Sequence, residues 1–219
     1  VMTVNPLLTP AVSIVASANP ICSGGSVTFT ATPTNGGNAP AYQWKVNGSN
    51  VTGATNATYT FIPSNGNTVA CTMTSNAACV SGNPASSNTI TMTVNPALPV
   101  SVAITASSNP VCAGTAVIFT ATPTNGGSIP AYQWRVNGTN VNGATNTTFV
   151  FTPSNGNVVC CQLTSNANCA TGNPALSNCI TMTVNPILPV SISIVGSANP
   201  VCEGTVVSFT ATPSNGGTA

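Results

Sequence analysis

A repeat with a period of 90 residues is the feature that most restricts how this chain can fold. Residues 8–97 align with residues 98–187 without a gap, and most of the aligned positions are identical. The markers of the repeat are an Asn-Pro pair and a tryptophan, found at Asn19-Pro20, Asn109-Pro110, Asn199-Pro200, Trp44 and Trp134. A regular repeat of this length is typical of a tandem array of similar structural units.

The repeat divides the sequence into four segments. Residues 1–6 match the end of a copy, so we expect them to be the last-strand tail of a preceding repeat. Residues 7–96 are repeat 1, residues 97–186 are repeat 2, and residues 187–219 are the start of an incomplete repeat 3. Because both ends of the sequence fall inside a copy, we expect the sequence to be a window on a longer array.

Proline marks the joins between the copies. Pro96 and Pro99 lie between repeats 1 and 2, and Pro186 and Pro189 lie between repeats 2 and 3. Each proline holds its own φ angle near one value, which stiffens the chain around it. We therefore expect short, semi-rigid linkers.

Within each copy, apolar residues alternate with threonine. Residues 27–31 and 89–94 both show this period of two, which predicts strands with one buried and one exposed face. Asn-Gly pairs between such segments are typical of tight turns, and no helical periodicity is visible. About six or seven short antiparallel strands per copy predict an all-β fold of tandem antiparallel β-sandwich domains. We expect Trp44 and Trp134 to anchor the cores of these domains.

Charged side chains are almost absent from the sequence. The chain has Lys45, Arg135 and Glu203 and no aspartate or histidine. Acid–base catalysis and metal binding need several such groups held together, so we predict no enzyme activity, no catalytic or metal site and no cofactor. Two distant cations cannot neutralise a row of phosphates, which excludes nucleic acid as a partner. No apolar run approaches the roughly 20 residues that span a membrane.

Several motifs resemble those of immunoglobulin-type domains. Residues 25–31 follow the pattern Gly-x-Val-x-Phe-x-Ala, Trp44 comes thirteen residues later, and Val69-x-Cys71 follows. In that family the position of Ala31 is commonly a cysteine that pairs with the counterpart of Cys71. The resemblance implies Ig-like sandwiches joined by short proline-containing linkers, without the usual disulfide between the two sheets.

A closer resemblance involves residues 20–24 (Pro-Ile-Cys-x-Gly), the Tyr-Gln-Trp of residues 42–44, Cys79 and a last strand at residues 88–94. This pattern is similar to the Ig-like repeats of very large secreted surface proteins, of adhesin or filament type, from gliding and biofilm-forming Gram-negative bacteria. The resemblance covers both complete copies and the start of the third.

This resemblance implies an extracellular location at the cell surface. It implies that the chain is a structural or adhesive repeat segment, forming a rod, a stalk or a self-associating filament. The alternative is an array of carbohydrate-binding modules within a large secreted enzyme.

The chain has nine cysteines, and without histidine or a C-x-x-C pair they favour disulfides formed in an oxidising compartment over a metal site. Cys160 and Cys179 stand where repeat 1 has Ala70 and Thr89. By alternation, both side chains point outward from strands that we expect to be neighbours. We therefore predict a cross-strand disulfide between Cys160 and Cys179.

The closer family typically has only the counterparts of Cys22 and Cys79 in each repeat. The resemblance therefore implies two disulfides, Cys22–Cys79 in repeat 1 and Cys112–Cys169 in repeat 2.

Three cysteines stay outside this scheme. Cys71 and Cys161 point inward by alternation, and we expect them to be small buried hydrophobic residues. Cys202 would pair with a cysteine beyond residue 219. A Cys22–Cys71 disulfide is the alternative.

The surface predicts association with copies of the same chain. The net charge of +1 leaves little electrostatic repulsion, and faces rich in threonine and asparagine can form hydrogen bonds laterally. Strand edges without lysine are open to strand addition. The alternative is a solvated stalk. Surface glycans and a host or substratum are further candidate partners.

Overall fold

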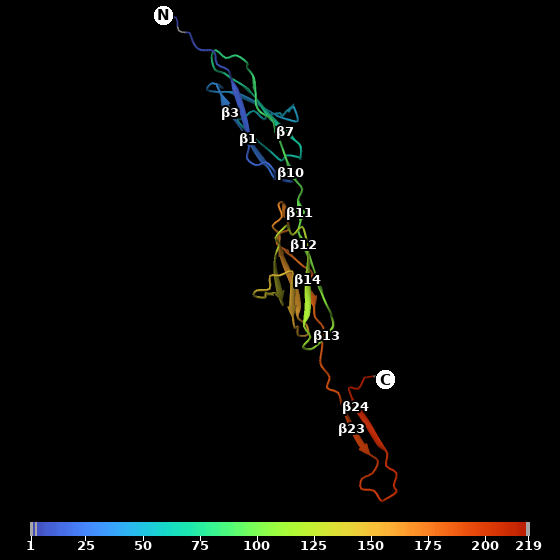
Figure 1. Ribbon diagram of the computed structural model, residues 1–219. Coiled ribbons are helices and arrows are strands. Elements are labelled where there is room, and N and C mark those ends of the chain that lie inside the picture. Colours follow the sequence, from blue (N-terminus) through green and yellow to red (C-terminus); the bar gives the residue numbers. More distant parts are fainter. Residues whose placement is uncertain (1, 3, 218–219) are drawn as a thin grey trace. The chain divides into compact units, whose positions relative to one another are not determined.

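The computed structural model describes residue 2 and residues 4–217, and these residues form strands and no helix (Figure 1). Equivalent first strands begin at Ala11, Ser101 and Ser191, which repeats the 90-residue period. The chain divides into two compact units. The first comprises Val1–Val100 together with Asn125–Ile129 and Ser165–Asn173, and the second comprises the remaining segments.

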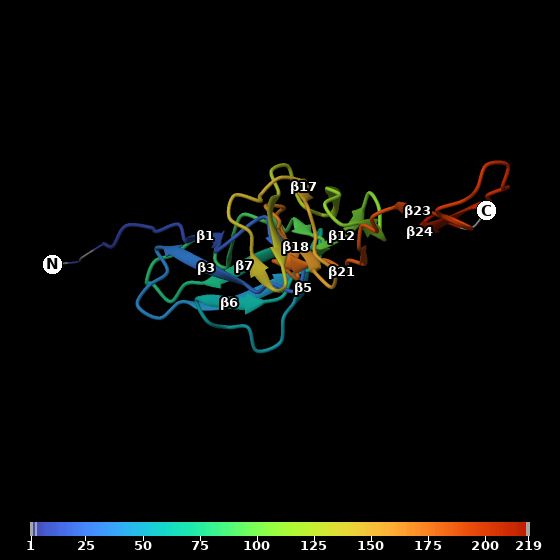
Figure 2. The same cartoon turned by 90° about the horizontal axis from the view of Figure 1, so that it is seen from below.

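Repeat 1 supplies most strands of the first unit. They are β1 (Ala11–Ala16), β2 (Ile21–Cys22), β3 (Val27–Thr34), β4 (Ala41–Val46), β5 (Ser49–Asn50), β6 (Thr58–Phe61), β7 (Thr68–Thr74), β8 (Ala85–Ser86), β9 (Ile90–Thr91) and β10 (Val94–Asn95). One sheet has the order β1-β3-β6, and its three strands can be followed in Figure 2. The other has the order β5-β4-β7-β8, with β9 also paired to β7. Both sheets are antiparallel.

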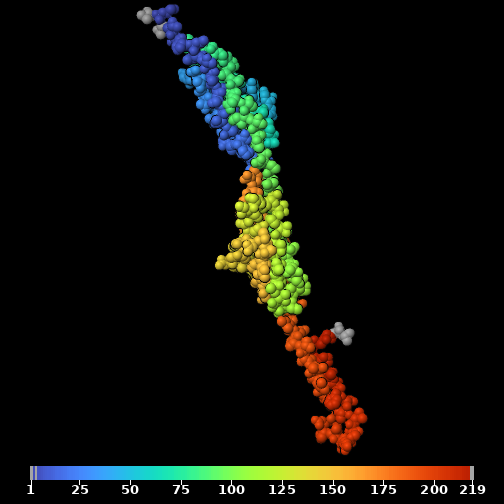
Figure 3. Space-filling model, viewed as in Figure 1, coloured from blue at the N-terminus to red at the C-terminus, as the bar shows by residue number. Residues whose placement is uncertain are grey.

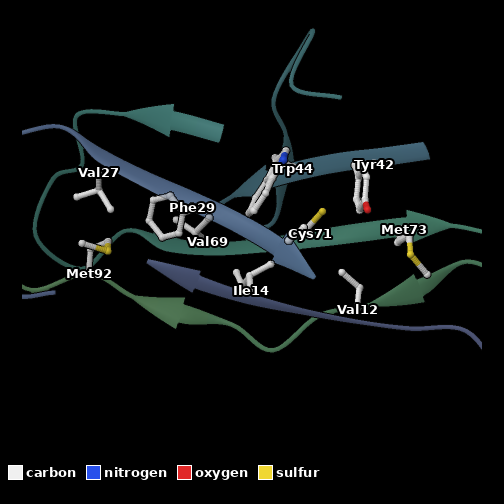
Figure 4. Close-up of a cluster of buried hydrophobic side chains, with 11 residues drawn as sticks. Val12, Ile14, Val27, Phe29, Tyr42, Trp44, Val69, Cys71, Met73 and Met92 are labelled. Atoms are coloured by element: carbon white, nitrogen blue, oxygen red, sulfur yellow. The ribbon is translucent and has the colours of Figure 1, made fainter. Parts of the chain in front are cut away.

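The inward faces of the two sheets form the core of repeat 1 (Figure 4). Alternation along β3 buries Val27, Phe29 and Ala31 and leaves the threonines between them more exposed, as the period of two predicts. Trp44 is fully buried, with its ring centroid 6.2 Å from that of Phe29. These features confirm an all-β, Ig-like sandwich.

Not every strand pair is antiparallel. β10 pairs with β2 in parallel, with Val94 opposite Ile21 and Asn95 opposite Cys22. The reason is that the first strand of the repeat is divided into β1 and β2. β1 pairs with β3, whereas β2 pairs with β10, the last strand of the repeat, which runs in the same direction as β2.

The edge of β1 is covered by an asparagine. The Asn88 side chain accepts a hydrogen bond from the Ile14 backbone N–H (2.8 Å) and donates one to the Ile14 carbonyl (3.1 Å). Asn178 makes the same two hydrogen bonds with Ile104 in repeat 2. At these positions the strand edge is therefore satisfied within its own repeat and is not open to strand addition.

The second unit repeats this arrangement. Its strands are β12 (Ser101–Ala106), β13 (Val111–Cys112), β14 (Val117–Thr124), β15 (Ala131–Val136), β16 (Thr139–Asn140), β17 (Thr148–Phe151), β18 (Val158–Thr164), β20 (Ala175–Leu176), β21 (Ile180–Thr181), β22 (Val184–Asn185), β23 (Ser191–Gly196) and β24 (Phe209–Ser214). The sheets are β12-β14-β17 and β16-β15-β18-β20, with β21 beside β18, and β13 pairs with β22 in parallel. β23 and β24, from repeat 3, form an antiparallel pair.

The linker after repeat 1 is itself a strand. β11 (Leu98–Pro99) pairs in parallel with β19 (Ala170–Thr171), and both belong to the first compact unit. Figure 3 shows this orange segment beside the green linker residues. The short proline-containing linker is thus held by backbone hydrogen bonds, from Leu98 to Cys169 (2.9 Å) and from Val100 to Thr171 (2.9 Å).

Candidate functional site

The cysteines carry the covalent chemistry of this chain, and one disulfide joins two neighbouring strands of repeat 2. β18 and β21 pair with Val159 opposite Ile180, which places Cys160 directly opposite Cys179. The structure joins these two cysteines, with their Cα atoms 4.5 Å apart. Antiparallel strands bring directly opposite Cα atoms this close at positions that do not exchange backbone hydrogen bonds.

The second disulfide corrects the pairing that the family resemblance implies. Cys22 is bonded to Cys169, with 5.4 Å between their Cα atoms. Neither Cys22–Cys79 nor Cys112–Cys169 forms, and the alternative Cys22–Cys71 does not form either. Cys169 lies in the segment Ser165–Asn173, which belongs to the same compact unit as repeat 1. The disulfide therefore joins a cysteine of repeat 1 to a cysteine of repeat 2.

The direction of β1 explains why Cys22 cannot reach Cys79. The Cys79 carbonyl accepts a hydrogen bond from the Leu8 N–H (2.8 Å), just before β1 begins. Cys22 lies in β2, after β1 has ended. The six residues of β1 span about 20 Å at the usual rise per residue. That span exceeds the ~7 Å limit for the Cα atoms of a disulfide.

The remaining cysteines fall into two groups. Cys71 and Cys161 are buried thiols, whereas Cys79, Cys112 and Cys202 are exposed thiols in the described part of the chain. Desolvation raises the pKa of the Cys161 thiol to about 11, although a hydrogen bond from the Gln133 backbone partly opposes the shift. The pKa of Cys71 is raised for the same reason. Both cysteines are therefore uncharged core residues at neutral pH.

Trypsin digestion is expected to distinguish these pairings, because the chain has only two cleavage sites, Lys45 and Arg135. After thiols are blocked and the chain is denatured without reductant, Cys22–Cys169 holds residues 1–45 to residues 136–219. Residues 46–135 are then released as a free peptide, which mass spectrometry of the unreduced digest detects.

The implied family pairing makes the opposite prediction for the same digest. Cys22–Cys79 and Cys112–Cys169 together would hold all three peptides in one species, and Cys22–Cys71 would hold residues 1–45 to residues 46–135. Either result would contradict the pairing in the structure. Digestion after reduction is the control, since it releases three separate peptides under every pairing.

The two tryptophans are core residues. Trp44 and Trp134 are both fully buried, and their indole N–H groups donate hydrogen bonds to the carbonyls of Asn56 and Asn146 (both 2.9 Å). The charged residue that follows Trp134 lies on the surface, where Arg135 Nε donates a hydrogen bond to Asn140 Oδ1 (2.8 Å).

Neither a metal site nor a membrane-spanning helix occurs among the described residues. No three His, Cys, Asp or Glu side chains there are grouped so as to hold a metal ion. The same residues include no helix with the length and apolar character needed to cross a bilayer.

Sequence reasoning missed the partnership of Cys22 with Cys169. The antiparallel strand order was a usable signal against the Cys22–Cys79 pairing, because it places the two ends of β1 near different loops. Which loop of repeat 2 meets Cys22 depends on contacts between segments about 150 residues apart, for which no local pattern exists.

No protein-family model matches this chain, and no curated protein matches it. Solved structures that it resembles include the full ectodomain (Ig1–Ig3) of mouse nectin-like molecule 4, at 16% identity and a TM-score of 0.34, over 81% of this chain and 65% of that one. The three N-terminal domains of the highly immunogenic outer capsid protein of bacteriophage RB49 match at 12% identity and a TM-score of 0.36, over 94% and 69%. Fibronectin(III)-like modules of Clostridium thermocellum CbhA match at 12% identity and a TM-score of 0.36, over 78% and 94%. These TM-scores are low, so the matched proteins carry no information about the function of this chain.

Proposed function

We propose that this chain is a structural or adhesive repeat segment of an extracellular bacterial surface protein, without enzyme activity of its own. The observation that carries the proposal is the Cys22–Cys169 disulfide, which ties one copy of the repeat to the next. Disulfides persist in oxidising compartments, which favours a location outside the cytoplasm. A covalent bond between successive copies suits a segment that transmits force or holds a fixed length.

The side chains available to a partner support a structural role. Each complete repeat buries its tryptophan, and the chain has three charged residues. The outward positions of β3 and β14 are mainly threonine, such as Thr30 in β3 and Thr120 in β14, which are exposed. We propose that these faces associate with copies of the same chain in a filament, because they carry hydrogen-bonding groups and little repulsive charge.

Electron cryomicroscopy of cells that produce the protein, labelled with an antibody against this chain, tests the proposal. The expected result is label outside the cell, on filaments in which the repeats make ordered lateral contacts. Label confined to the cell interior would overturn the extracellular role. Isolated, flexible strings outside the cell would contradict filament formation and favour the solvated stalk.

A matched variant separates lateral association from chance clustering. Thr30→Lys with Thr120→Lys places one positive charge at the same position of both complete repeats. We expect this variant to lose the lateral contacts, because like charges meet across them. Binding of the unmodified chain to a glycan array would instead favour the carbohydrate-binding alternative.

A further inference from the structure

The two halves of the Cys22–Cys169 linkage recur along the chain. Cys112 and Cys202 stand at the Cys22 position of repeats 2 and 3, and Cys79 stands at the Cys169 position of repeat 1. These three are also the exposed thiols of the described residues. Each is therefore one half of a linkage whose complete form is present once in this structure.

The first half of the linkage has the same local structure in both complete repeats. Cys22 lies opposite Asn95 in the parallel pair β2–β10, and Cys112 lies opposite Asn185 in the parallel pair β13–β22. Each cysteine carbonyl then accepts a hydrogen bond from the third following residue, at 3.0 Å for Cys22 and 3.1 Å for Cys112. Cys112 is thus presented in the way that Cys22 is, although it is not bonded here.

The second half is also reproduced. Cys79 and Cys169 both have left-handed backbone angles, with φ of 59° and 62°. Both carbonyls accept a hydrogen bond from the N–H of a leucine three positions before the first long strand of the repeat, Leu8 for Cys79 (2.8 Å) and Leu98 for Cys169 (2.9 Å). Because the unbonded Cys79 has the conformation of the bonded Cys169, the loop does not need the disulfide in order to take this form.

We propose that the array is joined by a ladder of disulfides, each linking the Cys22 position of one repeat to the Cys79 position of the next. Cys79 then bonds to the repeat that precedes repeat 1, and Cys112 bonds to the repeat that contains Cys202. This inference rests on the disulfide and the repeat, and it holds for a stalk as well as for a filament.

Each bond of the ladder forms by thiol–disulfide exchange with a disulfide-bearing oxidoreductase. The thiolate at the Cys79 position attacks the oxidant's disulfide, forming a mixed disulfide and releasing one of the oxidant's sulfurs. The thiolate at the Cys22 position of the preceding repeat then displaces the second sulfur. Two protein thiols are oxidised, one disulfide of the oxidant is reduced to a dithiol, and the two protons pass to that dithiol.

The ladder limits how far the chain can be stretched, because its loops overlap. Cys79 and Cys112 both lie within the loop that Cys22–Cys169 closes. Along the shortest covalent path, the chain runs 33 positions from Cys79 to Cys112 and then crosses a disulfide to the Cys79 position of repeat 3. That position lies two repeats after Cys79. At ~3.4 Å per extended residue, two repeats then extend by about 110 Å, against about 610 Å for an unlinked chain. The maximal extension therefore falls about fivefold.

Stretching the 219-residue chain by its ends in a force experiment tests whether the Cys22–Cys169 disulfide shortens its maximal extension. The Cys22–Cys169 bond spans 147 positions, so the oxidised chain should fall short of the reduced chain by about 500 Å of contour length. Under oxidising conditions Cys22→Ser should restore all but about 65 Å of this length, because the Cys160–Cys179 disulfide still spans 19 positions. The matched control Cys71→Ser should restore none of it, because Cys71 is a buried thiol outside both disulfides. Equal contour lengths for the unmodified chain and Cys22→Ser under oxidising conditions would show that this disulfide does not limit the extension.

Disulfide mapping of the protein isolated from cells that produce it tests the ladder. Free thiols are blocked with iodoacetamide before lysis, and the unreduced protein is digested and analysed by mass spectrometry. The ladder predicts that Cys79 and Cys112 are each bonded to a different repeat. Blocked thiols at Cys79 and Cys112, or bonds from them to cysteines of their own repeat, would overturn it. Both outcomes are independent of whether the protein forms filaments.

Discussion

Replacing Trp134 with alanine is expected to lower the free energy of unfolding of repeat 2 by about 4 kcal/mol. The indole is fully buried and its centroid lies 5.6 Å from that of Phe149 and 6.2 Å from that of Phe119. Truncation leaves a cavity between the sheets and removes the donor that the Asn146 carbonyl accepts from. Hydrogen–deuterium exchange of the β15 and β18 amides measures the loss, with repeat 1 as an internal reference.

Two control variants show whether the loss comes from the core. Trp134→Phe keeps an aromatic ring but removes the indole N–H, so we expect a smaller loss than for alanine. Ile129→Ala should leave exchange unchanged, because Ile129 is 78% exposed. A Trp134→Ala variant whose β15 and β18 amides exchange as slowly as in the unmodified chain would contradict the role of this residue as the core anchor.

Removing the Cys160–Cys179 disulfide is expected to lower the free energy of unfolding of repeat 2 by about 3 kcal/mol, from the entropy of closing a 19-residue loop. The best variant is Cys160→Ala with Cys179→Thr, because Ala70 and Thr89 occupy these positions in repeat 1. The replacements are thus already compatible with the fold. Denaturant-dependent hydrogen exchange, read separately for the two repeats, gives the difference.

Repeat 1 offers the reciprocal experiment. Ala70→Cys with Thr89→Cys places cysteines at the matching positions of β7 and the segment before β9, and we expect a gain of similar size under oxidising conditions. Reductant should abolish the gain. If the gain persists with reductant, or if the repeat 2 variant is as stable as the unmodified chain, the difference between the repeats does not arise from this disulfide.

Short-range patterns predicted the strands and the core of each repeat. Residues 27–31 alternate between apolar residues and threonine, and β3 buries that apolar set. The alignment of Cys160 with Ala70 and of Cys179 with Thr89 was enough to suggest a cross-strand bond, which the register of β18 and β21 brings into contact. These features depend on residues that are close in sequence or on neighbouring strands.

Longer-range features were not accessible in the same way. β2 and β10 form a parallel two-stranded sheet of their own, and strands of two residues have too little pattern to predict their pairing. The Asn88 contact with Ile14 joins residues 74 positions apart. Asparagine is common throughout this chain, so its presence at position 88 predicts no partner.

The sequence by itself determined that this protein is an all-β array of a 90-residue unit, with its tryptophans in the cores and few charges on its surface. Alternation and repetition are local properties, and they follow from the chemistry of each strand. Only the tertiary structure decided that Cys22 bonds to Cys169 and not to Cys79. Disulfide partners are chosen by distance in space, and the length of β1 separates Cys22 from Cys79 while the first compact unit brings Cys169 to Cys22.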